Sequence, residues 1–296
     1  MKRFMRIIKL VFLVILIALL AIVSISCKTA ERNPKEWAKL YGYKPEEVLS
    51  IEVGTLYRCP LLKGKINGLD AYVLFDTGNI AEPKISPAMR KKLDLKAVDS
   101  KPAYNSKTNT SDKINTFLCK KFSTLNENYT NLNVVEARDN KFDSSISLSM
   151  LINKRFTIDY KNRMMAISNS SSLGYKSKGE VLPLITNNRY KGMIVVKGTV
   201  NGRDALIQID TGKGSTSIDK KLVSSLNLNS KLGIYEIDNI KLGCLVFSSH
   251  KAKVSDFSHI SNGYSQPITL SLGSDIISQF VLTVDYQNNV VIINSR

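Results

Sequence analysis

Residues Gln208–Ile218 read QIDTGKGSTSI, an apolar run that ends in the tripeptide Asp210-Thr211-Gly212. Aspartate and glycine also suit any tight turn, so one such tripeptide decides nothing alone. The same context occurs earlier in the chain. Residues 63–79 (KGKINGLDAYVLFDTGN) and 197–213 (KGTVNGRDALIQIDTGK) are identical at nine of seventeen positions, including the Asp-Thr-Gly tripeptide. The chain therefore contains an internal repeat, and in each copy an aspartate follows the second apolar run.

Further elements extend this repeat. In each copy an Asn-Gly pair separates two apolar runs, which predicts a tight hairpin whose second strand ends at the aspartate. The copies close with matching segments, RFTIDYKNRMMAI (155–167) and VLTVDYQNNVVII (281–293), each of which reads as strand, polar turn and strand. We expect Asp159 and Asp285 in these segments to hydrogen-bond their turns.

The chain of 296 residues has 43% hydrophobic residues, enough for two folded units. The pattern predicts a mainly β protein with a few short helices. It divides into a first lobe at 60–168, a polar linker at 169–185 and a second lobe at 186–296. Residues 28–59 form an N-terminal helical segment and linker. There, Asn33 and Pro34 predict a helix start, and Trp37 is expected to pack the helix onto the body.

Residues 1–27 have the pattern of an export signal. Basic residues precede the apolar run Leu10–Ile25, and the sequence VSISC ends at Cys27 in a form similar to a bacterial lipobox. Three outcomes are open: lipidation of Cys27, plain cleavage after Ser26, or an uncleaved anchor. We expect an exported, membrane-anchored lipoprotein of the bacterial cell envelope, facing the periplasm or the surface.

The net charge of +17 is scattered along the chain, without a basic arm or basic helix. We therefore expect a solvated lysine-rich surface and no nucleic-acid partner. Weak attraction to anionic headgroups or acidic substrates is the alternative. Besides Cys27, the cysteines are Cys59, Cys119 and Cys244, read mostly as buried apolar residues. His250 and His259 are read as surface residues, so we expect no metal and no cofactor.

A strand that ends in Asp-Thr-Gly, then a short helix, a hairpin and a closing strand, resembles the retropepsin/pepsin family of aspartic proteases. The second copy keeps the family spacing from Asp210 to Ile218, and LSLGSDIISQFVLTVDY (270–286) is similar to the family's closing elements. The resemblance implies two tandem retropepsin-like β-barrel lobes that form a pepsin-like pseudo-dimer within a monomer. The polar run 103–115 predicts a projecting hairpin. The resemblance implies that this hairpin is a flap over a cleft between the lobes.

The resemblance implies an aspartic endopeptidase that cleaves a peptide or protein substrate with water activated between Asp76 and Asp210. Two carboxylates held close together share one proton, so one acts as base on the water and the other as acid. Gly78 and Gly212 would let the loops turn and bring N–H groups to the carboxylates. The hydroxyls of Thr77 and Thr211 would lock the two loops together.

Some residues depart from the family pattern. Asn79 and Lys213 follow the tripeptides where the family has Ala, Ser or Thr, and a cation beside the pair favours two ionised carboxylates. The first lobe also has an extra residue before Ile85, and we align Ser149 with Gly273.

The alternative function is therefore a non-catalytic envelope binding lipoprotein that uses the cleft between the lobes. A third reading is a different hydrolytic reaction in the same cleft.

Overall fold

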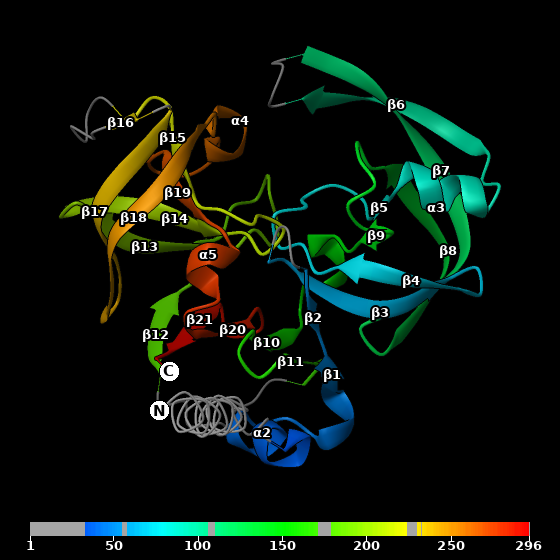
Figure 1. Cartoon of the computed structure of the whole chain (residues 1–296), viewed down its shortest axis with the longest axis horizontal. Helices are drawn as coiled ribbons and strands as arrows, with labels where there is room; N and C mark the ends of the chain where they lie inside the picture. Colours follow the sequence, from blue (N-terminus) through cyan, green and yellow to red (C-terminus); the bar gives the residue numbers. More distant parts are fainter. Residues whose placement is uncertain are drawn as a thin grey trace, which may run out of the picture.

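The structure is a computed structural model that describes residues 33–54, 58–105, 110–170, 179–223, 230–231 and 233–295. Cys27 and the predicted signal segment lie outside these ranges. The described chain forms two closed six-stranded β-barrels side by side, with a six-stranded sheet beneath their junction (Figure 1). The expectation of a mainly β protein with two β-barrel lobes is confirmed. No described helix has the length and apolar character needed to cross a bilayer.

The two barrels have the same strand order. The first closes as β3-β4-β9-β5-β8-β7, and the second closes as β13-β14-β19-β15-β18-β17. The strands of the first lobe, including the flanking β2 and β6, are β2 (Glu52–Val53), β3 (Pro60–Ile66), β4 (Leu69–Leu74), β5 (Lys84–Ile85), β6 (Ala97–Asn105), β7 (Thr110–Thr124), β8 (Glu127–Glu136) and β9 (Ser144–Ser145). Those of the second are β13 (Val195–Val200), β14 (Arg203–Ile209), β15 (Ser217–Asp219), β16 (Ser230–Lys231), β17 (Ile234–Leu242), β18 (Leu245–Ser255) and β19 (Ile268–Leu272).

The hairpins predicted at the two Asn-Gly pairs are present. Asn67 and Gly68 join β3 to β4, and Asn201 and Gly202 join β13 to β14. All four residues have positive φ, between 47° and 90°, as the tightest two-residue turns require. This turn fixes the register of each hairpin, so the second strand delivers its aspartate at the same place in each barrel.

The six-stranded sheet joins the lobes and follows the order β1-β11-β10-β20-β21-β12. Its strands are β1 (Val48–Ser50), β10 (Arg155–Asp159), β11 (Met164–Ser168), β12 (Glu180–Pro183), β20 (Val281–Asp285) and β21 (Val290–Asn294). Each lobe contributes three strands, and the central antiparallel pair is β10 with β20. There Thr157 lies opposite Thr283, and their buried hydroxyl oxygens are 2.7 Å apart. This pair marks the approximate two-fold axis of the molecule.

The predicted segments at the two ends of the first lobe partly join this sheet. Residues 48–50, expected in the N-terminal segment, form β1 on β11. Residues 180–183, expected in the linker, form β12 on β21. Asp159 and Asp285 bond the turns that follow their strands, as predicted: Asp159 Oδ1 accepts from the Asn162 N–H at 3.2 Å, and Asp285 Oδ1 accepts from the Asn288 N–H at 3.1 Å.

Short helices cover the ends of the barrels and the outer face of the sheet. They are α2 (Pro34–Leu40), α3 (Pro87–Lys92), α4 (Ser258–Ser261) and α5 (Ser274–Ile277), with single 3₁₀ turns η1 (Pro45–Glu47) and η2 (Leu148–Met150). The polar run of the first lobe forms a hairpin of β6 and β7, longer than β16 with β17 in the second lobe. This hairpin ends above the junction of the lobes in Figure 1, and its residues 106–109 lie outside the described ranges.

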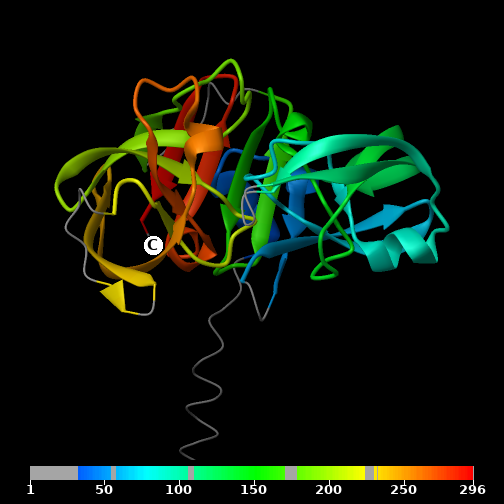
Figure 2. The same ribbon diagram turned by 90° about the horizontal axis from the view of Figure 1, so that it is seen from above.

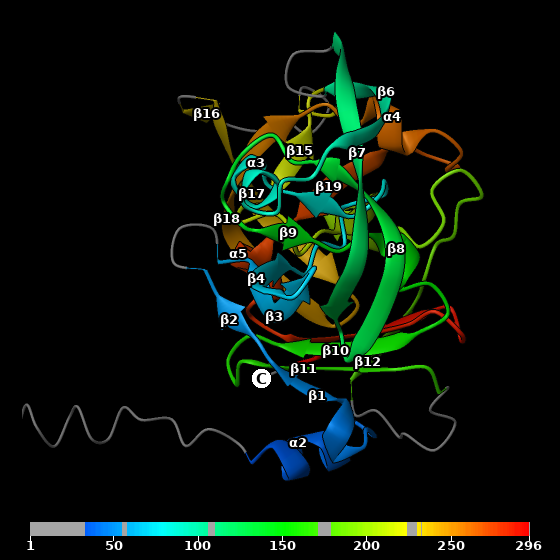
Figure 3. The same ribbon diagram turned by 90° about the vertical axis from the view of Figure 1, so that its right-hand side faces the viewer.

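Helix α2 packs on the sheet through a buried aromatic cluster, below the barrels in Figures 1 and 3. Asn33 caps the helix and Pro34 is its first residue, as predicted. Trp37 is fully buried, and its Nε1–H donates to Asp159 Oδ2 at 3.1 Å. The buried Arg155 donates to the carbonyl of Tyr41 at 2.9 Å. These contacts make the N-terminal segment part of the fold.

We expect Trp37→Ala to lower the free energy of unfolding by about 3–5 kcal/mol, because it leaves a large cavity and removes a partner of the buried Asp159. Leu40→Ala on the same helix is the control, since Leu40 is exposed and its truncation should cost less than about 1 kcal/mol. The shift of the urea midpoint measures both. Equal effects of the two substitutions would show that α2 is not anchored through Trp37.

Candidate active site

The two repeated loops meet at the junction of the barrels. Each loop leaves the strand that follows an Asn-Gly turn, so Asp76 comes after β4 and Asp210 after β14. Their exposed fractions are only 8% and 9%, and Thr77 and Thr211 are fully buried. Carboxyl groups this poorly hydrated have shifted protonation unless neighbours compensate for the lost water. The structure thus brings both predicted aspartates to one place.

The glycines allow the loops to approach each other. The Gly78 N–H donates to Asp76 Oδ1 at 2.9 Å, and the Gly212 N–H donates to Asp210 Oδ1 at 3.0 Å. Each glycine also lies against the carboxyl group of the opposite loop. A Cβ on Gly78 would be 2.3 Å from Asp210 Cγ, and one on Gly212 would be 2.2 Å from Asp76 Oδ1. Only glycine permits the two carboxyl groups to face each other this closely.

The threonines bond the loops in a reciprocal pattern. The Thr77 N–H donates to Thr211 Oγ1 at 3.1 Å, and the Thr211 N–H donates to Thr77 Oγ1 at 3.0 Å. The Thr77 hydroxyl then donates to the carbonyl of Ile209 at 2.9 Å, and the Thr211 hydroxyl donates to that of Phe75. Four hydrogen bonds therefore cross between the lobes at the base of the aspartate pair.

The segments that follow β9 and β19 hydrogen-bond the two aspartate loops. Their hydrogen bonds show that our alignment of Ser149 with Gly273 is wrong. The Leu148 N–H donates to the carbonyl of Asn79 at 2.9 Å, just as the Ser274 N–H donates to that of Lys213 at 2.7 Å. Ser147 precedes η2 as Gly273 precedes α5. Ser147, not Ser149, is therefore the structural counterpart of Gly273. The equivalent residues are those that make equivalent hydrogen bonds, and sequence similarity alone did not identify them.

Asn79, the first departure from the family pattern, supports the loop from inside. It is buried, and its side-chain amide donates to the carbonyls of Glu82 at 3.0 Å and Ile146 at 2.8 Å. These bonds hold the longer first loop, with its extra residue, onto the end of β9. The Asn79 side chain is thus engaged with the backbone of its own lobe.

Two lysines flank the aspartate pair, and sequence reasoning identified only Lys213. The Nζ of Lys84 lies 3.9 Å from Asp76 Oδ2, and the Lys84 side chain is 34% exposed. The Nζ of Lys213 lies 5.3 Å from the ring centroid of Phe257, and this side chain is partly buried. The alternation of side chains along a strand could have identified Lys84. Its neighbour Ile85 is a core residue, so the Lys84 side chain points to the opposite face of β5.

The electrostatics favour a shared proton on the pair. Burial, reinforced by the nearby Asp76 charge, raises the pKa of Asp210 to about 7, while Lys213, the Gly212 N–H and Lys84 act in the opposite direction. Burial also lowers the pKa of Lys213, against the pull of Asp210 and Asp275. The desolvation of Asp210 thus outweighs the two cations, so the pair keeps a proton that the lysines alone would remove.

A partly buried carboxylate, Asp275, supports the second loop, and sequence reasoning missed it. Its Oδ2 accepts from the Thr216 N–H and its Oδ1 from the Thr216 hydroxyl, both at 2.8 Å. The Nε2 of His250 lies 3.1 Å from the same carboxylate. His250 and His259 are partly buried, so the surface reading of the histidines is wrong. Twenty-five residues separate His250 from Asp275, so no local pattern shows the pair.

Two of the three described cysteines are buried in the first lobe. Cys59 and Cys119 are buried and Cys244 is exposed, which agrees with the reading that most are buried. Burial raises the pKa of Cys59 to about 12 and that of Cys119 to about 11, so both stay protonated. Within the described ranges, no three His, Cys, Asp or Glu side chains gather in a way that could hold a metal ion.

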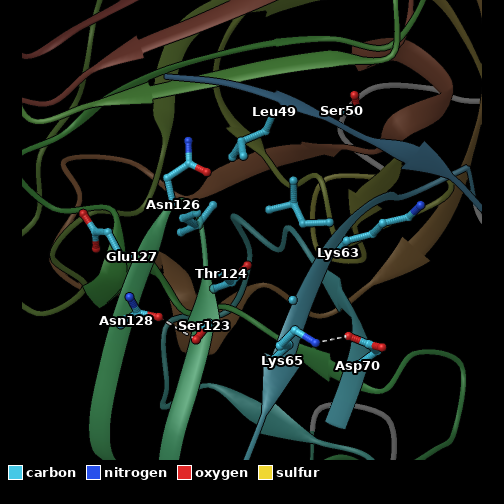
Figure 4. Close-up of a pocket in the computed structure, with 13 residues that line it drawn as sticks. Leu49, Ser50, Lys63, Lys65, Asp70, Ser123, Thr124, Asn126, Glu127 and Asn128 are labelled. Atoms are coloured by element: carbon cyan, nitrogen blue, oxygen red, sulfur yellow. Dashed lines mark hydrogen bonds and ion pairs between the residues drawn. The ribbon is translucent and has the colours of Figure 1, made fainter. Parts of the chain in front are cut away.

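A separate open pocket of about 630 Å³ lies in the first lobe, between β1, β3 and the β7–β8 turn (Figure 4). Most of its charged side chains form ion pairs with neighbouring side chains. Lys65 Nζ contacts Asp70 at 2.7 Å, and Glu127 pairs with Lys154. Neither aspartate of the central pair lines this pocket. It therefore adds nothing to the chemistry at the junction.

No protein-family model matches the chain, and no curated protein matches it significantly.

We expect Gly212→Ala to separate the two carboxyl groups, because the new Cβ would overlap Asp76. The matched control is Gly54→Ala, where the nearest atoms would be 3.8 Å and 3.9 Å away. Carboxyl carbon NMR should show the high pKa of Asp210 falling in Gly212→Ala and unchanged in the control. An unchanged titration in both variants would mean that the carboxyl groups do not depend on this contact.

We also expect a pH-dependent stability that comes from the aspartate pair, in which Asp210 has the raised pKa. Its folded-state pKa is raised, so the protonated group stabilises the fold; this contribution is complete below the usual aspartate pKa of about 3.9 and is lost as the pH rises through about 7. Relative to Asp210→Asn, the wild type should therefore gain stability between about pH 8 and about pH 4. Lys213→Met should move this change to higher pH. Parallel urea-midpoint profiles for wild type and Asp210→Asn would contradict it.

Proposed function

We propose that this protein is an aspartic endopeptidase that hydrolyses peptide bonds with water held between Asp76 and Asp210. The observation that carries the proposal is the symmetric meeting of two buried carboxyl groups, one from each lobe, over loops locked by Thr77 and Thr211. The resemblance of both loops to those of the retropepsin/pepsin family supports the same reading. Neither lobe alone contains the pair, so the monomer is the unit that acts.

The chemistry follows from the shared proton. The ionised member of the pair takes a proton from water as the water attacks the scissile carbonyl carbon, and the protonated member donates to the carbonyl oxygen. The tetrahedral intermediate then collapses as the leaving nitrogen receives a proton from the pair. Because the two groups titrate as a unit, neither role belongs to one named residue. The Gly78 and Gly212 N–H groups orient the carboxylates throughout.

The lysines favour a second candidate, a non-catalytic envelope binding protein. The cations Lys84 and Lys213 beside the pair stabilise two ionised carboxylates, which would leave no proton for the carbonyl oxygen. Such a protein would bind a ligand at the junction of the lobes without cleaving it. The raised pKa of Asp210 argues for the enzyme, since it keeps one proton near neutral pH.

We further propose that the protein is exported and held at a membrane by its N-terminus, through lipid on Cys27 or an uncleaved signal. The described chain starts at α2, on the face of the six-stranded sheet opposite the barrels, and the β6–β7 hairpin lies at the other end (Figures 1 and 3), while Figure 2 shows the two barrels side by side from above. An anchor before α2 would thus leave the aspartate pair directed away from the bilayer. A mass spectrum of the mature N-terminus tests this, and an intact Met1 would exclude both cleavage models.

The decisive experiment is cleavage of a peptide library by wild type, Asp76→Asn and Asp210→Asn. Each substitution should lower kcat/KM by about 10³-fold or more, because the pair acts as a unit. Activity of the wild type should fall above about pH 7, where Asp210 loses its proton. Asp70→Asn is the control, an exposed aspartate on the same hairpin as Asp76. Cleavage that survives in both variants would exclude this pair, and an inactive wild type would favour the binding protein.

A further inference from the structure

One cation from each lobe borders the aspartate pair, and the contact of Lys84 is loose. Its Nζ is 3.9 Å from Asp76 Oδ2, whereas a charge-assisted hydrogen bond is about 2.7–2.9 Å long. The contact is therefore electrostatic, and the three N–H donors of the ammonium group are not committed to Asp76. With a third of its side chain exposed, Lys84 is accessible to a ligand at the junction.

The fold itself does not require a lysine at this position. Lys84 pairs with Ser145 across β5 and β9, and its counterpart Ser217 pairs with Ser271 across β15 and β19. The second lobe builds the same strand pair and the same aspartate loop with a small buried serine. A long cationic side chain at Lys84 thus adds a charge to the site without serving the barrel.

Lys213 adds a second charge from the other lobe. It directly follows the Asp-Thr-Gly tripeptide, and its ammonium group rests against the Phe257 ring while it pulls on the Asp210 carboxylate. An aspartate pair that holds one proton carries one negative charge, and the two lysines carry two positive charges. The Asp275 carboxylate adds a further negative charge that acts on Lys213, so the partly exposed Lys84 is the cation left to attract an anionic ligand group.

We propose that Lys84 and Lys213 select substrates that carry a carboxylate beside the scissile amide bond. This inference rests on the proposed endopeptidase function and names its substrate class. The carboxylate has two sources, an acidic side chain next to the cleaved bond or the free C-terminus of a short peptide that is cleaved a few residues before its end. In either case it takes Lys84 as its partner, weakens the pull of that cation on Asp76, and lets the pair keep the proton needed for the carbonyl oxygen.

The test begins with a peptide mixture cleaved by the wild type, with the cleavage sites read by mass spectrometry. The best substrate is then resynthesised with each flanking Glu or Asp replaced by its amide, and with a free or an amidated C-terminus. Loss of the relevant carboxylate should lower kcat/KM roughly tenfold, the size expected for a hydrogen bond to a charged group. The side-chain and C-terminal arms separate the two sources.

Three variants assign the effect to the site. Lys84→Ser introduces the residue that the second lobe uses, and Lys213→Met removes the other charge while keeping length. Both should reduce the preference for the acidic peptide. Lys241→Met is the control, because Lys241 is an exposed residue of β17 with no place at the junction. A preference that persists unchanged in Lys84→Ser and Lys213→Met, or a wild type without any preference, would overturn the proposal. The urea midpoint of each variant shows that it is folded.

If the protein is not an endopeptidase, the carboxylate site can still be tested by peptide binding. If the wild type cleaves no peptide, fluorescence polarisation of labelled hexapeptide pools rich in Glu or in Gln measures selection directly. Tighter binding of the Glu pool, lost in Lys84→Ser and kept in Lys241→Met, would support the carboxylate site in a protein that only binds. Equal binding of the two pools would overturn it.

Discussion

The reciprocal hydrogen bonding of Thr77 and Thr211 is the constraint on which the central site depends. Each hydroxyl accepts from an N–H of the opposite loop and donates to a carbonyl of the opposite lobe, so neither loop can adopt its conformation alone. Buried hydroxyl and N–H groups without partners are costly, which ties the placement of both aspartates to the docking of the lobes. The carboxyl pair is therefore a property of the interface and not of either barrel.

The same axis passes through the sheet beneath. The paired hydroxyls of Thr157 and Thr283 lie at the centre of a sheet to which each lobe gives three strands. Two threonine pairs thus hold the lobes in register, one in the sheet and one in the loops. Between them, Tyr160 of the first lobe contacts Ser274 of the second at 3.1 Å, so the central interface is polar as well as apolar. Such an interface specifies one arrangement, because a shifted register would leave these groups unpaired.

The repeat predicted most of this arrangement because local signals specify it. An Asn-Gly turn fixes hairpin register, and two equal hairpins deliver two aspartates to equivalent places. The sequence could not show contacts made between distant segments. The pairing of His250 with Asp275 and the support of Trp37 by Asp159 join residues with no local pattern in common. The alignment of Ser149 instead of Ser147 with Gly273 failed for a related reason. In a short polar strand, hydrogen bonding defines the equivalent residues, and the sequence does not show that hydrogen bonding.

The central strand β20 is also among the last segments of the chain, at residues 281–285, and it pairs with β10 of the first lobe. The first barrel can close before the second has been synthesised, but the sheet between the lobes cannot, since it waits for the final strands. Pairings this distant in sequence form late in folding. The two aspartates would therefore be held together only once β10 and β20 have paired, so the site would be incomplete at every earlier stage of folding.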